Sequence, residues 1–385
     1  MEAAGVEVPI IWRGRRARAF VPHRLLDRDL TIDARTVSAT ARAQAAVEHA
    51  AEGMPDDFTA LARLLLRAEG VASSFIEGVS APAVDIVLAE DDKGGSPSTA
   101  AWVAANLEAV ADAIEEAHTD PLSVDSLCRW HQTLLQGGPS PARHAGVLRT
   151  EQGWIGGTSP LYAHLVTPPP DAVPALVDDL VTYANRDDID VITQAAVSHA
   201  QFEIIHPFAD GNGRIGRVLV NWILTRRLSL VTPPPVSARI AADVGGYTSG
   251  LVLFRTGAHD DWIRWFADAV SGAGRTQREL IASVGRLRLQ WRERLGETRP
   301  QGRRLRSDAA AWRTLDLLPR HLVLTGPIVS GELSIPLKSA NAALNQLADA
   351  GVLVEHGTVQ RGRGRPSRLY VSAELLGLTG SNPLR

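Results

Sequence analysis

A glycine-rich segment between two apolar runs is the feature that most restricts how this chain can fold. It reads His-Pro-Phe-Ala-Asp-Gly-Asn-Gly-Arg-Ile-Gly-Arg over residues 206–217, and helical spacing precedes and follows it. Pro207 biases His206 away from helical geometry, so one helix must end there, and another can begin near Arg214. The glycines and the free N–H groups of the second helix then form a concave nest that favours an anion such as phosphate.

The polar side chains around this nest suit the phosphates of a nucleotide. Arg214 and Arg217 are three residues apart, so they share one helix face, and their guanidinium groups match phosphate oxygens. Asp210 offers a hard oxygen ligand for Mg²⁺. His206 is the only nearby general base, and a helix C-terminus favours its charged form. These residues by themselves predict phosphoryl-type transfer.

The segment resembles the core motif of the Fic family, His-x-Phe-x-Asp/Glu-Gly-Asn-Gly-Arg-x-x-Arg, and matches all eight of its fixed positions. The similarity extends to residues 195–205, 146–149 and 154–157, and it covers roughly residues 30–290. It implies a mainly α fold, in which a helical bundle carries a short β-hairpin flap. It also implies transfer of AMP from ATP to a protein, with Mg²⁺ as cofactor.

The resemblance implies a role for each position of the motif. Gly211 is retained where relatives with other activities, such as kinases, typically replace it, which favours AMP transfer. The alternative interpretation of the segment 206–217 is a structural helix corner, with a C-cap glycine and solvated arginines. The implied roles are base for His206, Mg²⁺ ligand for Asp210, anion hole for Gly211, Asn212 and Gly213, and outer-phosphate binding for Arg214 and Arg217.

A second segment, Ser73-Ser-Phe-Ile-Glu77-Gly78, resembles the inhibitory motif found before many Fic cores. The resemblance implies that Glu77 pairs with Arg217 and removes the partner of the γ-phosphate, so that basal transfer is slow. The alternative is an ordinary pair four residues apart on a helix surface, with Gly78 as C-cap. In some relatives this glutamate supports removal of AMP from a target, which is a second activity open to this chain.

The turn-rich segment 152–166 is expected to form the flap, an exposed hairpin. Such a hairpin can bind a protein target by adding one of its segments as an extra strand. Because main-chain pairing carries little sequence information, the flap does not show which protein is modified, or whether the hydroxyl belongs to Tyr, Thr or Ser.

The last part of the chain is expected to be a small winged helix-turn-helix domain with a basic wing at 360–368. DNA is therefore a candidate partner. The expected recognition helix carries one cation, Lys338, with Asn341 and Asn345 as weak candidates for base contacts. Packing or protein contacts are the alternative role of this domain.

Four regions follow from these patterns. Residues 1–31 lack a clear pattern and are expected to be irregular. A helical run is expected over 58–68 and continues near 71–77. The regions are an N-terminal helical region over 1–110 with an inhibitory helix at about 71–78, a Fic core over 111–297, a linker over 298–306, and the winged helix-turn-helix domain over 307–385.

Composition restricts the remaining choices. The 385 residues carry a formal net charge of -3, so any pull toward nucleic acid must be local. Cys128 is the only cysteine, which excludes an internal disulfide and favours the cytoplasm. No apolar run approaches the ~20 residues of a membrane-spanning helix, so no membrane partner is expected.

The sequence leaves two candidate functions. A homodimer is compatible with both. The first is a protein adenylyltransferase that Glu77 inhibits. The second is a DNA-binding regulator whose core senses a nucleotide. The intact His206 favours the enzyme, because a pure sensor of phosphate needs no base.

Overall fold

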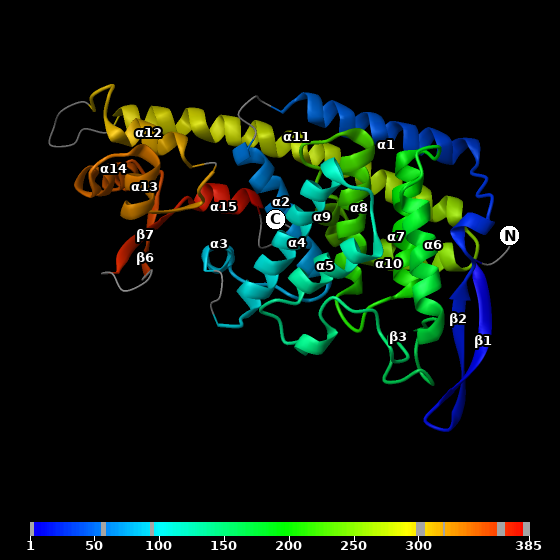
Figure 1. Ribbon diagram of the computed structural model, residues 1–385. Coiled ribbons are helices and arrows are strands. Elements are labelled where there is room, and N and C mark those ends of the chain that lie inside the picture. The colour runs from blue at the N-terminus through cyan, green and yellow to red at the C-terminus, as the bar shows by residue number, and fades with distance from the viewer. Residues whose placement is uncertain are drawn as a thin grey trace.

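The computed structural model describes residues 4–54, 59–92, 96–297, 305–318, 320–359 and 366–379. These residues form a mainly α-helical molecule with three small antiparallel sheets (Figure 1), which confirms the expected fold class. In the described part of the chain no helix is both long and apolar enough to span a bilayer.

The larger part of the molecule is a helical bundle built around α7 (Val191–Ile205) and α8 (Asn212–Leu228). Every residue of α7 is buried, because apolar residues occur all around this helix rather than along one stripe. The surrounding helices are α1 (Ala34–Glu52), α2 (Thr59–Ile76), α3 (Ala83–Asp91), α4 (Thr99–Thr119), α5 (Val124–Leu134), α6 (Val173–Ala184), α9 (Val236–Ala242), α10 (Val244–Arg255) and α11 (His259–Glu297). Short 3-10 turns lie at Leu25–Asp27, Ala142–His144 and Pro170–Ala172.

The longest of these helices, α11, runs along α1 and continues to the C-terminal part of the molecule (Figure 1). It has 39 residues, so it spans about 58 Å at 1.5 Å per residue. The helix therefore forms one rigid side of both parts of the molecule. Residue 110 lies inside α4, and the described part of α11 reaches Glu297.

The N-terminal segment is a β-hairpin that projects from the bundle (Figure 1). Strand β1 (Gly5–Trp12) pairs along its whole length with β2 (Arg15–Pro22). The two turn residues, Arg13 and Gly14, have φ angles of 47° and 77°, the left-handed pair that matches the twist of a tight hairpin. The expectation of irregular structure over residues 1–31 is therefore wrong for this hairpin.

Helix α2 continues through Gly70, as expected for a helical run over 58–68 that continues near 71–77. The backbone at Gly70 lies so close to α4 that a Cβ atom there would approach Leu107 Cγ to 2.8 Å. The glycine therefore serves the contact of α2 with α4.

The expected flap contains a minimal hairpin. Strand β3 (Trp154–Ile155) pairs antiparallel with β4 (Leu165–Val166). Gly156 and Gly157 follow β3 with φ angles of 69° and 67°, a backbone geometry that favours glycine. The flap lies beside the N-terminal hairpin, where the rings of Trp12 and Trp154 are 6.2 Å apart.

The C-terminal module comprises helices around a three-stranded sheet with strand order β5-β7-β6. Strand β5 was not expected, whereas the three helices and the later hairpin follow the expected order. Residues 298–304 of the expected linker and 360–365 of the expected wing lie outside the described residues. The elements are α12 (Ala310–Asp316), β5 (Val323–Thr325), α13 (Gly326–Leu333), α14 (Leu337–Asp349), β6 (Val354–Val359), β7 (Ser367–Val371) and α15 (Ala373–Thr379).

Asn341 and Asn345, the weak candidates for base contacts, lie on α14 but face the module itself. Asn345 Oδ1 accepts a hydrogen bond from the Tyr370 hydroxyl at 2.8 Å. Asn341 is half-buried, and its Oδ1 lies where a Cβ atom on Gly326 would stand. Both side chains therefore take part in packing within the module.

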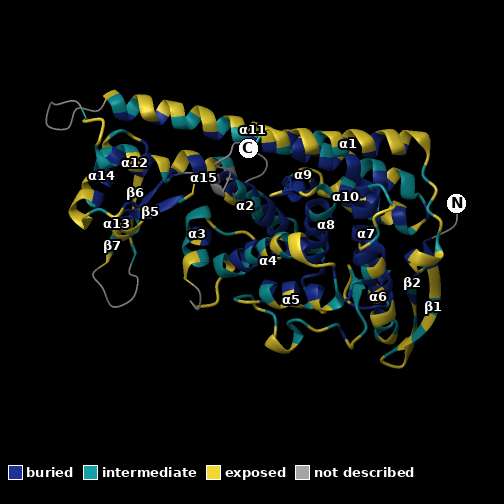
Figure 2. Ribbon diagram, turned by 45° about the horizontal axis from the view of Figure 1, so that its top comes forward, coloured by how far each residue is buried: buried dark blue, intermediate teal, exposed yellow. Residues whose placement is uncertain are grey.

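Among the described residues, the buried apolar ones form a large core, a second core that crosses the module boundary and a small third cluster around α3 and α4. Figure 2 colours the buried residues dark blue. The larger one surrounds α7 and α8. The second joins the apolar side chains of the C-terminal module to residues of α2, α3 and α11. The module is thus packed on the bundle through shared apolar residues rather than tethered beside it.

Candidate functional site

The segment 206–217 forms a sharp turn between the two central helices. Helix α7 ends at Ile205, and His206 takes a left-handed conformation with φ 51°. Gly211, with φ 76°, then caps the start of α8, which begins at Asn212. The N-terminus of α8 therefore opens into the turn, as the sequence predicts, with the backbone geometry of an anion nest.

The imidazole of His206 is neutral and has one nitrogen fixed by the backbone. Its Nδ1 atom lies 3.3 Å from the carbonyl oxygen of Glu203. Because a carbonyl only accepts, Nδ1 carries the proton and Nε2 is left as the basic nitrogen. Burial lowers the pKa of His206 to about 4, which outweighs the expected stabilisation of its charged form by the helix end.

The turn is held closed by its own asparagine and by a second histidine. Asn212 Oδ1 accepts from Phe208 N, and Asn212 Nδ2 donates to Phe208 O, both at 2.8 Å. His131 donates from Nε2 to the Asp210 carbonyl at 3.0 Å, because its Nδ1 accepts from the Gly146 amide. The His131 ring stacks on Phe208 at 3.9 Å. The Asn212 side chain thus fixes the loop, and only its backbone N–H remains for the anion hole.

Arg149 connects the end of α7 to the flap. Its guanidinium donates to the carbonyl oxygens of Ile205 at 3.3 Å and His206 at 2.8 Å. It also donates to Glu151 O at 2.9 Å and Pro168 O at 2.7 Å, on the two sides of the flap. One buried arginine therefore sets the position of the flap relative to the candidate base.

Arg214 is buried but still has hydrogen-bonding capacity. Its guanidinium carbon lies 4.3 Å from the centre of the Trp102 ring, and its side chain is 2% exposed. The Nε and Nη1 atoms have no hydrogen-bond partner among the described residues. Because buried N–H groups are normally paired, these atoms suggest a site for an absent anion.

Arg217, in contrast, is engaged by the segment expected to be inhibitory. Its Nε and Nη2 donate to Ser73 Oγ at 2.9 Å and Ser73 O at 2.8 Å. Nη2 also lies 2.8 Å from Glu77 Oε1. That carboxylate stands directly over Gly213, where a Cβ atom would be 2.1 Å from Oε1. Glu77 therefore lies at the anion nest, and Gly78 follows it with φ 74°.

Asp210 lies at the mouth of the turn with its side chain 43% exposed. Its Oδ1 accepts from the Gly211 amide at 2.7 Å, and its Oδ2 accepts from the Ser140 hydroxyl. No group of three or more His, Cys, Asp or Glu side chains within the described ranges is arranged to hold a metal. A single exposed carboxylate fits Mg²⁺ that takes its other ligands from phosphates and water.

Glu203 is a buried carboxyl group behind the turn. A Cβ atom on Gly216 would lie 2.5 Å from its Oε1, and that oxygen has no hydrogen-bond partner within the described structure. Burial raises the pKa of Glu203 to about 8; the Arg217 charge opposes this shift and the Glu77 charge adds to it. The group is therefore mainly protonated at neutral pH.

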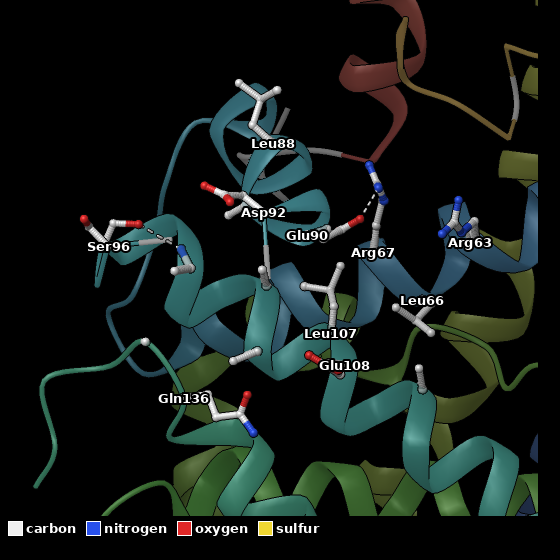
Figure 3. Close-up of a pocket in the computed structure, with 17 residues that line it drawn as sticks. Arg63, Leu66, Arg67, Leu88, Glu90, Asp92, Ser96, Leu107, Glu108 and Gln136 are labelled. Atoms are coloured by element: carbon white, nitrogen blue, oxygen red, sulfur yellow. Dashed lines mark hydrogen bonds and ion pairs between the residues drawn. The ribbon is translucent and has the colours of Figure 1, made fainter. Parts of the chain in front are cut away.

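A separate pocket of about 640 Å³ lies between α2, α3 and α4 (Figure 3). Arg67 and Glu90 point toward each other on its wall and form an ion pair. None of the residues predicted from the sequence to act in catalysis, nucleotide binding or inhibition lines it. The pocket is therefore distinct from the catalytic turn.

The structure brings together all of the predicted site residues around the turn, but sequence reasoning missed several of their supports. Arg149 belongs to a segment that resembles the Fic family. The sequence therefore marked this position but did not indicate what its side chain does. Glu203 also lies in such a segment, residues 195–205, without an assigned role. His131, Ser140 and Trp102 carried no motif, and their positions depend on helix packing.

Comparison with known protein families finds a match over the region that contains the turn. Residues 121–224 match the Fic/DOC family. The matched segment contains the turn together with His131 and Arg149, whereas Ser73, Glu77 and Gly78 lie before it.

Two named relatives are similar over short segments. The protein adenylyltransferase fic-1 of Caenorhabditis elegans is 34% identical over 110 residues, which are 28% of this chain and 20% of that protein. A probable protein adenylyltransferase of Aquifex aeolicus is 50% identical over 58 residues, which are 15% of this chain and 18% of that protein. The chain thus matches about a fifth of the length of these relatives.

A solved structure supports the fold over a longer span. The crystal structure of a Fic family protein from Desulfovibrio desulfuricans matches with a TM-score of 0.55 and 21% sequence identity. The match covers 89% of this chain and 98% of that one. The likeness shows a shared fold over most of the described molecule.

Proposed function

We propose that this chain, whose residues 121–224 match the Fic/DOC family, is a protein adenylyltransferase that moves AMP from ATP to a hydroxyl group of a protein. The observation that carries the proposal is the neutral His206 imidazole beside an anion nest. Its Nδ1 is fixed by a carbonyl oxygen, so Nε2 is free to take a proton. The names of the relatives support nucleotidyl transfer.

In the proposed reaction, the target hydroxyl attacks the α-phosphorus of ATP and gives its proton to His206 Nε2. A bond forms between the hydroxyl oxygen and the α-phosphorus. The bond from that phosphorus to the bridging oxygen of the β-phosphate breaks, and pyrophosphate leaves. The low pKa of His206 keeps its imidazole neutral before the step.

The phosphates would lie over the N-terminus of α8. The unpartnered Nε and Nη1 atoms of Arg214 would donate to one phosphate, and the backbone N–H groups of the nest to another. Asp210 would hold Mg²⁺, which when bound neutralises phosphate charge. Arg217 would bind the outer phosphate once it is free of Glu77.

The contacts of Arg217 support autoinhibition. Glu77 and Ser73 occupy its guanidinium, and the Glu77 carboxylate stands over Gly213, where an anion would bind. Productive ATP binding therefore requires that Glu77 moves away, which makes basal transfer slow.

The flap is the proposed docking site of the protein target. It is joined to the catalytic turn through Arg149, so a strand added to the flap would hold a fixed distance from His206. The modified residue is a Tyr, Thr or Ser of that strand.

The proposal is tested by incubating the purified chain and its Glu77→Gly variant with α-labelled or γ-labelled ATP, Mg²⁺ and added protein. Labelling of protein by α-labelled ATP alone is expected, and the Glu77→Gly variant should label at least about tenfold faster, because loss of one charge-assisted hydrogen bond to Arg217 is worth that much. Glu77→Gln is the matched control for backbone effects of glycine.

His206→Ala in the Glu77→Gly background should lower labelling by a factor of about 100 to 10,000, the usual contribution of a general base. Labelling from γ-labelled ATP alone would indicate a kinase and contradict AMP transfer. An unchanged rate in Glu77→Gly would contradict the inhibition while leaving the transfer chemistry intact.

A further inference from the structure

Helix α2 belongs to two parts of the molecule at once. Its N-terminal half lies in the second core: Leu64 and Leu65 are each 1% exposed there and share that core with the apolar residues of the C-terminal module. Helix α15 packs on α2, as both views of the molecule show (Figures 1 and 2). Arg63 Nη1 also donates to the Arg320 carbonyl at 3.5 Å. The module therefore contacts this half of the helix directly.

The middle of α2 is fixed to the catalytic bundle by a buried carboxylate. Glu69 Oε1 accepts from Asn221 Nδ2 at 3.0 Å and from the Ser237 hydroxyl, and its Oε2 accepts from Ser237 N at 2.7 Å. Asn221 in turn donates to the carbonyl oxygen of Arg217 at 2.9 Å. Glu69 is thus an anchor point on α2, next to the helix turn that carries Arg217.

The C-terminal end of the same helix positions the inhibitory contact. Ser73 lies in the last turn of α2 and accepts a hydrogen bond from Arg217. Glu77 is the first residue after the helix and forms an ion pair with the same arginine. Ser73 lies nine positions after Leu64, which is a distance of about 14 Å along the continuous helix. Because a helix of this length is stiff, loss of support at its N-terminal half allows a tilt about Glu69 that moves Ser73 and Glu77.

We propose that the C-terminal module controls the inhibition by clamping α2. While the module packs on the N-terminal half of α2, Glu77 is held over Gly213. A partner that loosens this packing would release Arg217 for the outer phosphate of ATP. This proposal rests on the proposed adenylyltransferase function and supplies the regulation of the same site.

The test compares two leucines of the module that are both fully buried. Leu375 lies on α15, which packs on α2, whereas Leu344 lies on α14, which packs on α12 and α13. Leu375→Ala and Leu344→Ala each remove the same atoms from a buried site. Leu344→Ala is therefore the control for general loosening of the module.

With α-labelled ATP, Leu375→Ala should raise protein labelling about fivefold over the unsubstituted chain. Leu344→Ala should leave it unchanged. In the Glu77→Gly background neither substitution should change the rate, since no inhibitory contact remains to be loosened. Equal effects of the two leucines, or an effect of Leu375→Ala that persists without Glu77, would overturn the clamp.

A second readout does not depend on catalysis. Amide hydrogen exchange at residues 71–78 should become faster in Leu375→Ala and stay unchanged in Leu344→Ala, because α2 loses a restraint only in the first variant. Unchanged exchange in Leu375→Ala would contradict the clamp even if AMP transfer itself proved wrong. Faster exchange together with absent labelling would contradict the proposed function alone.

Discussion

At the scale of single residues, His206 is subject to two opposed effects. The end of α7 favours its imidazolium form, while burial disfavours it, and burial dominates, with a pKa of about 4. The proton that the base accepts in the reaction is therefore held weakly. That is compatible with a base that must return the proton to solvent after each transfer.

This balance predicts the acid side of the pH profile. In the Glu77→Gly variant the rate of AMP transfer should show no loss from His206 between about pH 6 and 8. It should then fall about tenfold for each pH unit below about 4, as the imidazole becomes protonated. Initial rates with α-labelled ATP, with circular dichroism as a check on folding, measure this. A midpoint near 6.5 would contradict the buried position of the base.

Glu203 predicts a pH effect on stability of known sign. Its pKa is raised to about 8 in the folded chain, above the ordinary value of 4.5. The folded state therefore binds a proton that the unfolded state releases, so the contribution of this group to stability is present below about pH 4.5 and is lost as the pH rises to about 8. Relative to the Glu203→Gln variant, the chain should lose up to about 1 kcal/mol of unfolding free energy per pH unit in this window.

The difference between the two proteins should level off above about pH 8, and urea unfolding at several pH values measures it. Buried His131 and half-buried His206 do not confound the upper part of this range. Their pKa values are lowered to about 4, so their effect on stability lies below the ordinary value of 6.5. A difference that is constant from pH 6 to 9 would show that Glu203 is ionised in the folded chain.

The residue roles were partly predictable. The spacing of the motif placed Arg214 and Arg217 on one helix face, and the structure has them there. The supports of the turn were not predictable, because His131 and Arg149 reach it from other segments and their contacts are set by tertiary packing. Burial of His206 was missed for the same reason: local sequence gives the helix end, but not what covers it.

At the scale of elements, the turn is held by its own side chains as well as by its neighbours. The two hydrogen bonds between Asn212 and Phe208 close it, and Phe208 is 1% exposed. The resemblance assigned Asn212 to the anion hole. Its side chain gives the backbone N–H groups of the nest their geometry, so the anion hole stays a prediction for the backbone of this residue.

Asn212→Ala should therefore act on both folding and transfer. Two buried backbone groups of Phe208 would lose their partners, which costs about 2–4 kcal/mol of unfolding free energy. In the Glu77→Gly background AMP transfer should fall more than thermal stability alone explains, with a raised KM for ATP, because the nest loses its shape. Thermal unfolding and initial rates measure these effects. Asn221→Ala, which removes a neighbouring buried amide outside the turn, is the control for stability.

The N-terminal hairpin is an element that the sequence analysis did not predict. Its two-residue turn is Arg13-Gly14, in which both residues take left-handed conformations, whereas the sequence signal for such a turn is strongest for Asn-Gly or Asp-Gly. Pro9 and four arginines further weaken the pattern of alternating apolar residues. Pairing with the partner strand and packing beside the flap favour strands here, and neither is visible locally.

At the scale of the whole molecule, the module and the bundle share one apolar core. Leu280, Val284 and Trp291 of α11 and Leu64 of α2 belong to it together with the module residues. The Trp291 indole also donates to the Glu374 carboxylate at 2.6 Å. The sequence suggested a separate domain after a polar linker, since periodicity gives the apolar face of each helix but not the part of the molecule that covers it.

A shared core predicts that the two parts unfold together. If the module unfolded alone, α2 and α11 would expose the leucines and the tryptophan that it covers, and each exposed large side chain costs about 1.5–3 kcal/mol. Unfolding of the module thus weakens the bundle, and the reverse also holds. Differential scanning calorimetry should show one transition, with a calorimetric enthalpy close to the van't Hoff value.

Leu375→Ala removes part of the contact with α2 and should broaden this transition or split it, whereas Leu344→Ala should shift it without splitting. Two separate transitions in the unsubstituted chain would mean that the module is an independent domain, and that its packing on α2 is too weak to hold Glu77 in place.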